Sequence, residues 1–280
     1  NPNPNANPSS LQNGCVNMSD IPPEIQNVLT DCAKTILPQV YTDLAQPGVK
    51  AVGQALGTVL ELSSTILLPL KLVNEKAKLL FAKRMNEYKE KLESIPEEKR
   101  AKVAPELGTP ILDKLTYTTN DEIAELFTNL LANASNEDRV NVAHPSFVSM
   151  IEHLSPDEAR VLKYFQRTNE VLYCNFNGDV EKGYYTLKSH STLIGKYVEL
   201  QYPQNESAYL SNFESMGILK DENGSYKVGY PQYDEIEDYA KLESLKSAYV
   251  PSKYKSITVE KGYYTITSFG KMFIAACTKV

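Results

Sequence analysis

The stretch 144–162 reads HPSFVSMIEHLSPDEARVL and contains the starts of two predicted helices. The first starts after His144 and carries apolar residues at helical spacing. The second starts at Ser155, because a hydroxyl residue followed by proline and two acidic residues is typical of a capped helix start. The sequence changes character here, which predicts a boundary between a helical domain, 18–154, and a second domain, 155–280.

The second domain is predicted to mix helices with short strands. A helix over 206–216 ends at Gly217, and residues 218–220 then start a hairpin that turns at 223–224. Further strands are expected at 183–187, 226–228 and 262–266, and further helices at 234–249 and 267–277. These elements predict a mainly α protein, with an N-terminal helical domain and a C-terminal α+β, winged-helix-like domain.

The helical domain contains the most apolar region of the chain, residues 51–73. Gly53 and Gly57 are four residues apart, a spacing that lets another helix approach closely. The uncharged run is interrupted at Glu61 and ends before Lys71, so it is shorter than the roughly 18 residues that indicate a membrane span. We expect this region to pack in a helical core, and insertion into a membrane is the alternative. The residues that would make either contact are Gly53, Gly57, Leu60, Leu67, Leu68 and Pro69.

The next segment, residues 71–102, carries ten basic residues against six acidic ones and is predicted to form a long amphipathic helix up to Ser94. A solvated helix face with Glu–Lys pairs is one interpretation of its charges. Contact with an anionic membrane surface is the other. The basic residues that would form such a surface include Lys71, Lys76, Lys78, Lys83 and Arg84.

The composition narrows the class of protein. Hydrophobic residues make up 42% of the chain and charged residues 23%, as in soluble globular proteins. The net charge of -6 provides no general attraction to nucleic acid or anionic lipid. The four cysteines show neither a CxxC pair nor a zinc spacing, which indicates reduced thiols in a cytoplasm. Residues 1–17 are rich in Asn and Pro and lack a signal-peptide pattern, so we expect a disordered leader or tag.

No catalytic motif is visible in the sequence. GxxxxGK[ST], GxGxxG and GxSxG are all absent. His144, His153 and His190 do not have the spacing of a metal-binding pair on one helix face. We therefore predict a non-enzymatic protein without catalytic residues, cofactor or metal, and an enzyme with an unfamiliar site remains the alternative.

A winged-helix-like domain could also bind DNA. Its recognition helix would be 206–216, which carries Glu206 and Glu214 and no Lys or Arg. Helices that read DNA grooves normally supply Arg, Lys, Asn or Gln to bases and phosphates. The sequence therefore favours a winged helix that contacts protein over one that binds nucleic acid.

Three blocks of the chain resemble the abortive-infection alpha family of bacterial phage-defence proteins. The most specific block is 144–162, which is similar to the family's most recognisable segment. The helix over 122–133, which follows a capping Asn120, and the closing segment 264–277 are also similar to the family. The positions that carry the main resemblance are His144, Pro145, Phe147, Leu154, Ser155, Glu158 and Ala159. The resemblance implies a role in which an infected cell stops growing or dies before phage progeny are released.

The leading hypothesis is a cytoplasmic, non-enzymatic defence protein that acts through a protein partner or self-association, with a phage component as its trigger. In this hypothesis the helical domain acts as effector or assembly module, and the C-terminal domain binds the partner. The first alternative is a membrane-disrupting effector that inserts Ala51 to Val73 when activated. The second is a DNA-binding regulator.

Overall fold

A computed structural model describes residues 75–250 and 252–280. The predicted leader, the apolar region 51–73, Lys71 and the side chain of Lys78 lie outside the described residues. Both interpretations of the apolar region therefore stay predictions. In the part of the chain that the structure describes, no helix has the length and apolar character needed to cross a bilayer.

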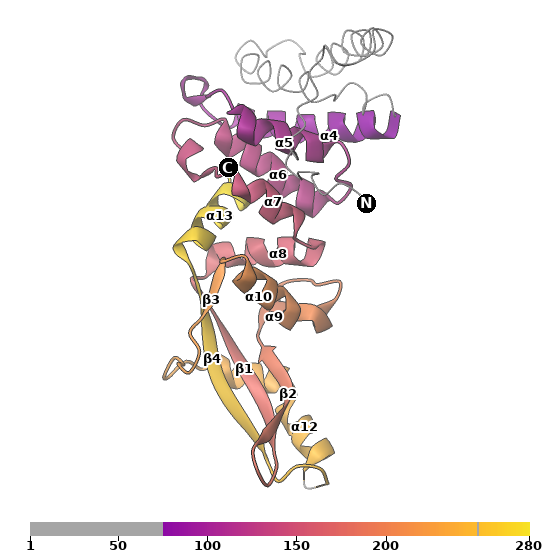
Figure 1. Cartoon of the computed structure of the whole chain (residues 1–280), viewed down its shortest axis with the longest axis vertical. Helices are drawn as coiled ribbons and strands as arrows, with labels where there is room; N and C mark the ends of the chain where they lie inside the picture. The colour runs from indigo at the N-terminus through magenta and orange to yellow at the C-terminus, as the bar shows by residue number, and fades with distance from the viewer. Residues whose placement is uncertain (1–74, 251) are drawn as a thin grey trace, which may run out of the picture.

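One end of the molecule, which we call the helical half, consists of residues 75–167 and 268–278 (Figure 1). Its α-helices are α4 (Glu75–Glu93), α5 (Pro105–Leu115), α6 (Asp121–Ala134), α7 (Ser146–Glu152), α8 (Pro156–Tyr164) and α13 (Ser268–Thr278). Short 3-10 turns connect them at η2 (Glu97–Lys99), η3 (Val140–Val142) and η4 (Phe165–Arg167). Helix α6 lies at the centre, since it contacts α4, α5, α7, α8 and α13.

Helix α6 shows why its sequence forms a central helix. The side chain of Asn120 accepts a hydrogen bond from the backbone N of Ile123 at 3.1 Å, which caps the first turn. Ten of its fourteen residues are buried, because neighbouring helices cover it on several sides. The helix predicted over 122–133 is thus confirmed. The predicted end of the long basic helix at Ser94 is also confirmed, because α4 ends at Glu93.

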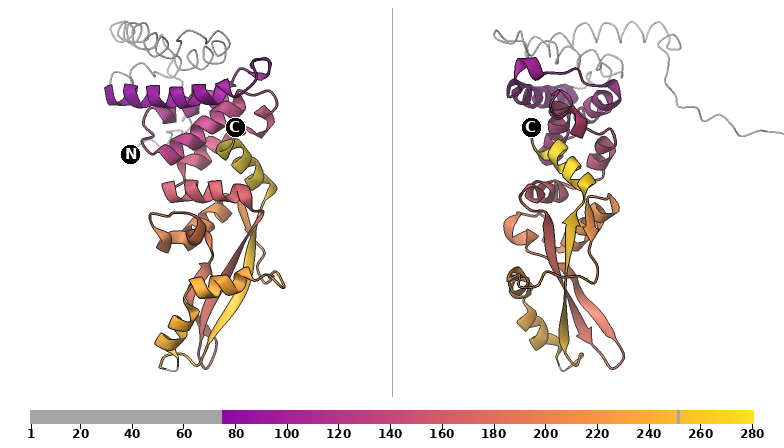
Figure 2. Two further views of the ribbon diagram at one scale, coloured as in Figure 1. Left: turned by 180° about the vertical axis from the view of Figure 1, so that it is seen from behind. Right: turned by 90° about the vertical axis from the view of Figure 1, so that its left-hand side faces the viewer.

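The other part, which we call the arm, consists of residues 170–266 and extends away from the helices (Figure 2). Its antiparallel sheet has the strand order β2-β1-β4-β3. The strands are β1 (Glu170–Asp179), β2 (Tyr184–Ser191), β3 (Leu219–Asp221) and β4 (Ile257–Ile266). The connecting helices are α9 (Ile194–Tyr197), η5 (Pro203–Asn205), α10 (Glu206–Ser215), α11 (Gln232–Tyr239) and α12 (Leu242–Tyr249). A small apolar core between the sheet and α11 and α12 includes Phe176, Tyr233 and Ile236.

Two predictions for the arm are wrong. Residues 218–220 do not start a hairpin, because β3 pairs with β4 and residues 226–228 form no strand. The helix predicted over 234–249 is broken at Lys241, whose backbone is left-handed at φ 60°. This break keeps both Ala240 and Leu242 buried against the sheet. The mainly helical fold is confirmed. The strands of the second domain form a four-stranded antiparallel sheet, and a winged helix is not confirmed.

The arm is inserted into the helical half through two neighbouring strands. Strand β1 follows η4, and β4 precedes α13; the two strands pair with each other from Glu170 opposite Thr265 to Gly178 opposite Ile257. One hydrophobic core continues from α4 through α8 to α13. The core therefore runs across the boundary predicted at residue 155, and that boundary stays a prediction.

The end of α13 is anchored on the helical half by side-chain donors. The final carbonyls of a helix have no partner within the helix, so they need donors from elsewhere. Asn129 and Asn133 of α6 donate to the carbonyls of Cys277 at 2.9 Å and Ala276 at 2.8 Å. Arg139 donates to the carbonyl of Ala275 at 2.7 Å. These contacts join α13 to a part of the chain that lies far away in sequence.

Candidate functional site

The block 144–162 begins with an aromatic cluster between α7 and α13. The ring centroid of Phe147 lies 5.4 Å from that of Phe269 and 5.0 Å from that of Phe273. The ring of His144 lies beside them, 5.6 Å from Phe147, and its Nδ1 is 2.7 Å from the hydroxyl of Ser146. His144 thus orders the start of α7 and borders an apolar contact between two helices.

The same block continues with a capping box at the start of α8. The backbone N of Ser155 donates to Glu158 at 2.6 Å, and the backbone N of Glu158 donates to the Ser155 hydroxyl at 3.3 Å. Asn212 of α10 donates to the second carboxylate oxygen of Glu158 at 2.7 Å. The predicted helix start is confirmed, and Glu158 also holds a helix of the arm.

Asp157 is the polar centre of this joint, a role that was not visible in the sequence. Its side chain is buried and accepts hydrogen bonds from the backbone N of Gln201 at 2.9 Å and of Tyr202 at 2.8 Å. The Tyr209 hydroxyl donates to it at 3.0 Å and Arg160 at 2.5 Å. Burial alone would raise the pKa of Asp157, but these donors outweigh it and hold the pKa below its usual value.

Burial and the nearby carboxylate of Asp157 raise the pKa of Tyr209 to about 12, so the phenol stays protonated and remains a donor. Leu154 and Ala159 are buried in the core, whereas Pro145 is exposed. The block 144–162 is therefore a joint that connects α7 and α8 to α13 and α10.

The basic residues of α4 do not all lie on the exposed surface that the sequence suggested. Lys76 and Lys83 are exposed, but the side chain of Arg84 is only 1% exposed. Arg84 donates to Glu87 at 2.9 Å and to Asp121 at 2.7 Å, while Lys83 donates to the same Asp121 oxygen at 2.8 Å. Hydrogen bonds from Lys83 and Arg84 lower the pKa of Asp121. Arg84 consequently belongs to the contact between α4 and α6 and not to a membrane-facing surface.

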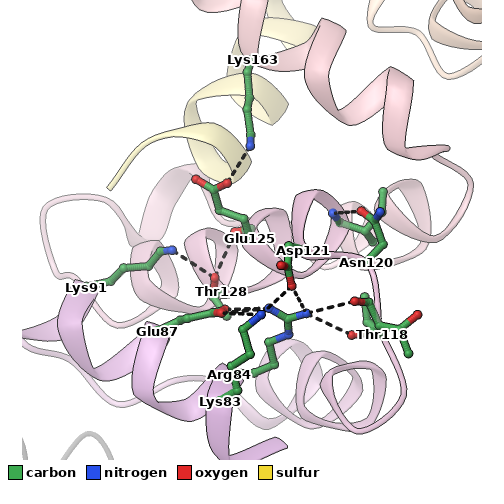
Figure 3. A network of polar contacts seen from close by, with 12 residues as sticks. Lys83, Arg84, Glu87, Lys91, Thr118, Asn120, Asp121, Glu125, Thr128 and Lys163 are labelled. Atoms are coloured by element: carbon green, nitrogen blue, oxygen red, sulfur yellow. Dashed lines mark hydrogen bonds and ion pairs between the residues drawn. The ribbon is translucent and has the colours of Figure 1, made fainter. Parts of the chain in front are cut away.

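A second polar contact joins α8 to α6. The Lys163 ammonium donates to Glu125 at 2.6 Å and also bonds Glu122. On the neighbouring α4, Lys91 donates to the Thr128 hydroxyl at 3.2 Å (Figure 3). Charged residues of the helical half are thus used to fix its helices to one another.

The arm presents a different surface, made of exposed aromatic side chains. Strand β2 lies at one edge of the sheet, and Tyr184 and Tyr185 on it are 59% and 66% exposed. Nine of the twelve exposed large hydrophobic residues among those described lie in the arm. The crowding of tyrosines was visible in the sequence, but which of them point outward depends on strand pairing. We refer to Tyr184 and Tyr185 on the β2 edge as the tyrosine edge.

The metal-binding side chains form no cluster in the part of the chain that the structure describes. No group of three or more His, Cys, Asp or Glu residues in residues 75–250 and 252–280 could hold a metal ion. Cys174 and Cys277 are buried free thiols. Burial raises the pKa of Cys174 to about 12 and that of Cys277 well above its usual value, so both stay protonated.

Comparisons with known proteins found one family and one solved structure. The sequence profile of the family described as abortive infection alpha matches residues 73–277, so almost all of the apolar region 51–73 lies outside the match. Comparison with curated protein sequences found no match. An uncharacterised protein from the hydrocarbon-degrading marine bacterium Alcanivorax borkumensis SK2 is similar at 15% identity over 51% of this chain and 96% of that chain, with a TM-score of 0.31.

Proposed function

Because the chain belongs to the abortive infection alpha family, we propose that it acts in abortive infection by binding a protein partner through the tyrosine edge, without catalysis. In this proposal a phage component triggers the binding, and the infected cell stops growing before progeny are released. The helical half keeps the arm in position and takes part in assembly.

The observation that supports this function is the position of the tyrosine edge. Strand β2 has a neighbouring strand, β1, on only one side in the described sheet, so its other side is open to an added strand. Partner proteins often bind such an edge by adding a strand, and side chains on the edge then decide specificity. An exposed edge with large side chains is otherwise a liability for aggregation.

The chemistry of the exposed residues also fits a protein partner. Tyrosine is enriched at protein interfaces, because its ring buries apolar area and its hydroxyl still forms hydrogen bonds. Tyr184 and Tyr185 have little role in the cores of the molecule, since both side chains are exposed. Their exposure is therefore better explained by recognition than by folding.

A phage-infection experiment tests the proposal. The full chain is expressed in a phage-sensitive bacterial host, and plaque formation and survival of the culture are measured across a panel of phages. We expect fewer plaques, together with growth arrest of infected cells at high phage dose. The double variant Tyr184→Ser and Tyr185→Ser should restore plaque formation.

The matched control is Val140→Ser, which changes an exposed apolar residue of the helical half that is 47% exposed. This variant should protect as well as the natural sequence. Unchanged plaque numbers with every phage would refute the role in defence. Full protection by the double tyrosine variant would instead refute the tyrosine edge as the binding surface.

A further inference from the structure

A cavity of about 610 Å³ lies in the arm between the end of β2, the start of α10 and the break between α11 and α12. Residues lining it include Lys188, His190, Ser191, Glu206, Ser207 and Lys241. We propose that this cavity binds a small molecule that carries one phosphate group and several hydroxyl groups, such as a sugar phosphate. Its volume is within the range of about 300–1,000 Å³ that is usual for small-molecule sites.

The backbone around this cavity is strained at two positions. Among the described residues, the non-glycine residues with positive φ are His190 at 47° and Lys241 at 60°, and both line the cavity. Such conformations are unfavourable for residues other than glycine and persist where the surrounding structure holds them, often at ligand sites. The backbone N of His190 is held by the side chain of Asn175 at 2.8 Å. Two strained residues from distant parts of the chain thus meet at one cavity.

The two lysines of the cavity differ from most other lysines in the arm. Within residues 75–250 and 252–280, neither Lys188 nor Lys241 has a carboxylate oxygen within 4.0 Å. Other lysines of the arm are paired with a carboxylate, namely Lys196, Lys220, Lys227, Lys246 and Lys261. Lysine is a common partner of phosphate groups. The cavity therefore offers two ammonium groups that form no close ion pair of their own.

The start of α10 adds a second feature that suits an anion. Glu206 and Ser207 are in the first turn of this ten-residue helix, and the N-cap residue Asn205 makes no side-chain capping bond. The N-terminus of a helix has a partial positive charge, and here the backbone N–H of Glu206 is already bonded to the carbonyl of Pro203. In addition, Ser191 is only 8% exposed and its hydroxyl has no hydrogen-bond partner, which is unusual for a buried polar atom.

The carboxylate of Glu206 explains why the ligand should also carry hydroxyl groups. Glu206 accepts a hydrogen bond from the Thr192 hydroxyl and lines the same cavity as the two lysines. A carboxylate repels a polyanion, but it accepts hydrogen bonds from hydroxyl groups. A cavity lined by two ammonium groups and one carboxylate therefore favours a sugar phosphate over a bare anion.

Calorimetric titration of the full chain with ribose 5-phosphate, ribose and inorganic phosphate tests this proposal. We expect ribose 5-phosphate to bind more tightly than either fragment, by about tenfold or more. The double variant Lys188→Gln and Lys241→Asn should weaken its binding by about tenfold or more, because both ammonium groups are lost. Asn is chosen at 241 because it tolerates a left-handed backbone.

The charge-matched control is the double variant Lys182→Gln and Lys255→Gln, which removes two exposed lysines that do not line the cavity. Its affinity for ribose 5-phosphate should equal that of the natural sequence. An absence of binding, or an equal loss in both double variants, would overturn the site. Inorganic phosphate binding as tightly as ribose 5-phosphate would overturn the role of the hydroxyl groups. Unchanged melting temperatures of both variants without ligand would show that folding is unaffected.

Discussion

The helical half and the arm distribute their side chains in opposite ways. Among the described residues, eight of the eleven buried polar or charged residues lie in the helical half. Nine of the twelve exposed large hydrophobic residues lie in the arm. The helical half thus uses polar groups inside to fix its helices, whereas the arm places aromatic groups outside. We therefore expect substitutions of buried polar residues in the helical half to cost more stability than substitutions of exposed aromatic residues in the arm.

The largest effect that tests this comparison is expected at Asp157. Its replacement by Ala removes the acceptor of Arg160, of the Tyr209 hydroxyl and of two backbone N–H groups, so we expect a loss of about 3–5 kcal/mol in the free energy of unfolding. Denaturant unfolding followed by circular dichroism measures it. The control is Glu137→Ala, an exposed acidic residue, which should leave stability unchanged. Equal stability of both variants would contradict the role of Asp157 as the centre of the joint.

The next effect concerns the anchoring of α13. Asn133→Ala removes the donor to the Ala276 carbonyl and the acceptor of Arg139, which should cost about 1–3 kcal/mol. Asn86→Ala, at an exposed position of α4, is the matched control. Hydrogen exchange of α13 should increase in the first variant only. Unchanged protection of α13 would show that these hydrogen bonds do not hold the helix.

A smaller effect on the free energy of unfolding is expected when the pH is lowered. Because the pKa of Asp157 is lowered in the folded protein, its contribution to stability is present above the usual Asp pKa and is lost as pH falls through the lowered value. Stability of the natural sequence should therefore fall as the pH drops below about 4. When the free energy of unfolding is plotted against pH, the slope for Asp157→Ala should be smaller than that for the natural sequence, by at most about 1.4 kcal/mol per pH unit. Parallel curves in denaturant titrations at several pH values would contradict this assignment.

The smallest effect on stability is expected in the arm. Replacing Tyr184 and Tyr185 by Ser should change the free energy of unfolding by less than about 0.5 kcal/mol each, because both side chains are exposed. The same denaturant experiment checks it. A loss as large as that of Asp157→Ala would mean that these tyrosines support folding, and the contrast between the two regions would disappear.

Features that depend on neighbouring residues were predictable from the sequence. Asn120 and Ser155 cap helices through backbone groups three residues away, so their roles could be predicted correctly. The helix α10 and its end at Gly217, where φ is 72°, follow from equally local signals. The capping box of the family block is therefore the part of the joint that the sequence could predict.

Features that depend on distant segments were not predictable in the same way. Strand β1 is buried on parts of both faces and lacks regular alternation, so it gave no clear strand pattern. Strand β3 pairs with β4, whose residues lie far along the chain, and not with its own neighbours. Asp157 becomes a centre of hydrogen bonds only when residues 201–209 fold against it. The cavity in the arm likewise combines residues from three separate segments.

The path of the chain through the arm has a consequence for synthesis on the ribosome. Helix α6 is made early, but its partner α13 follows only after 133 further residues, 135–267. At roughly 5–20 residues per second, the apolar side of α6 waits on the order of 7–27 s for that partner. Nascent chains would therefore expose this side during translation, and chaperones that bind apolar segments have the opportunity to act before the bundle closes.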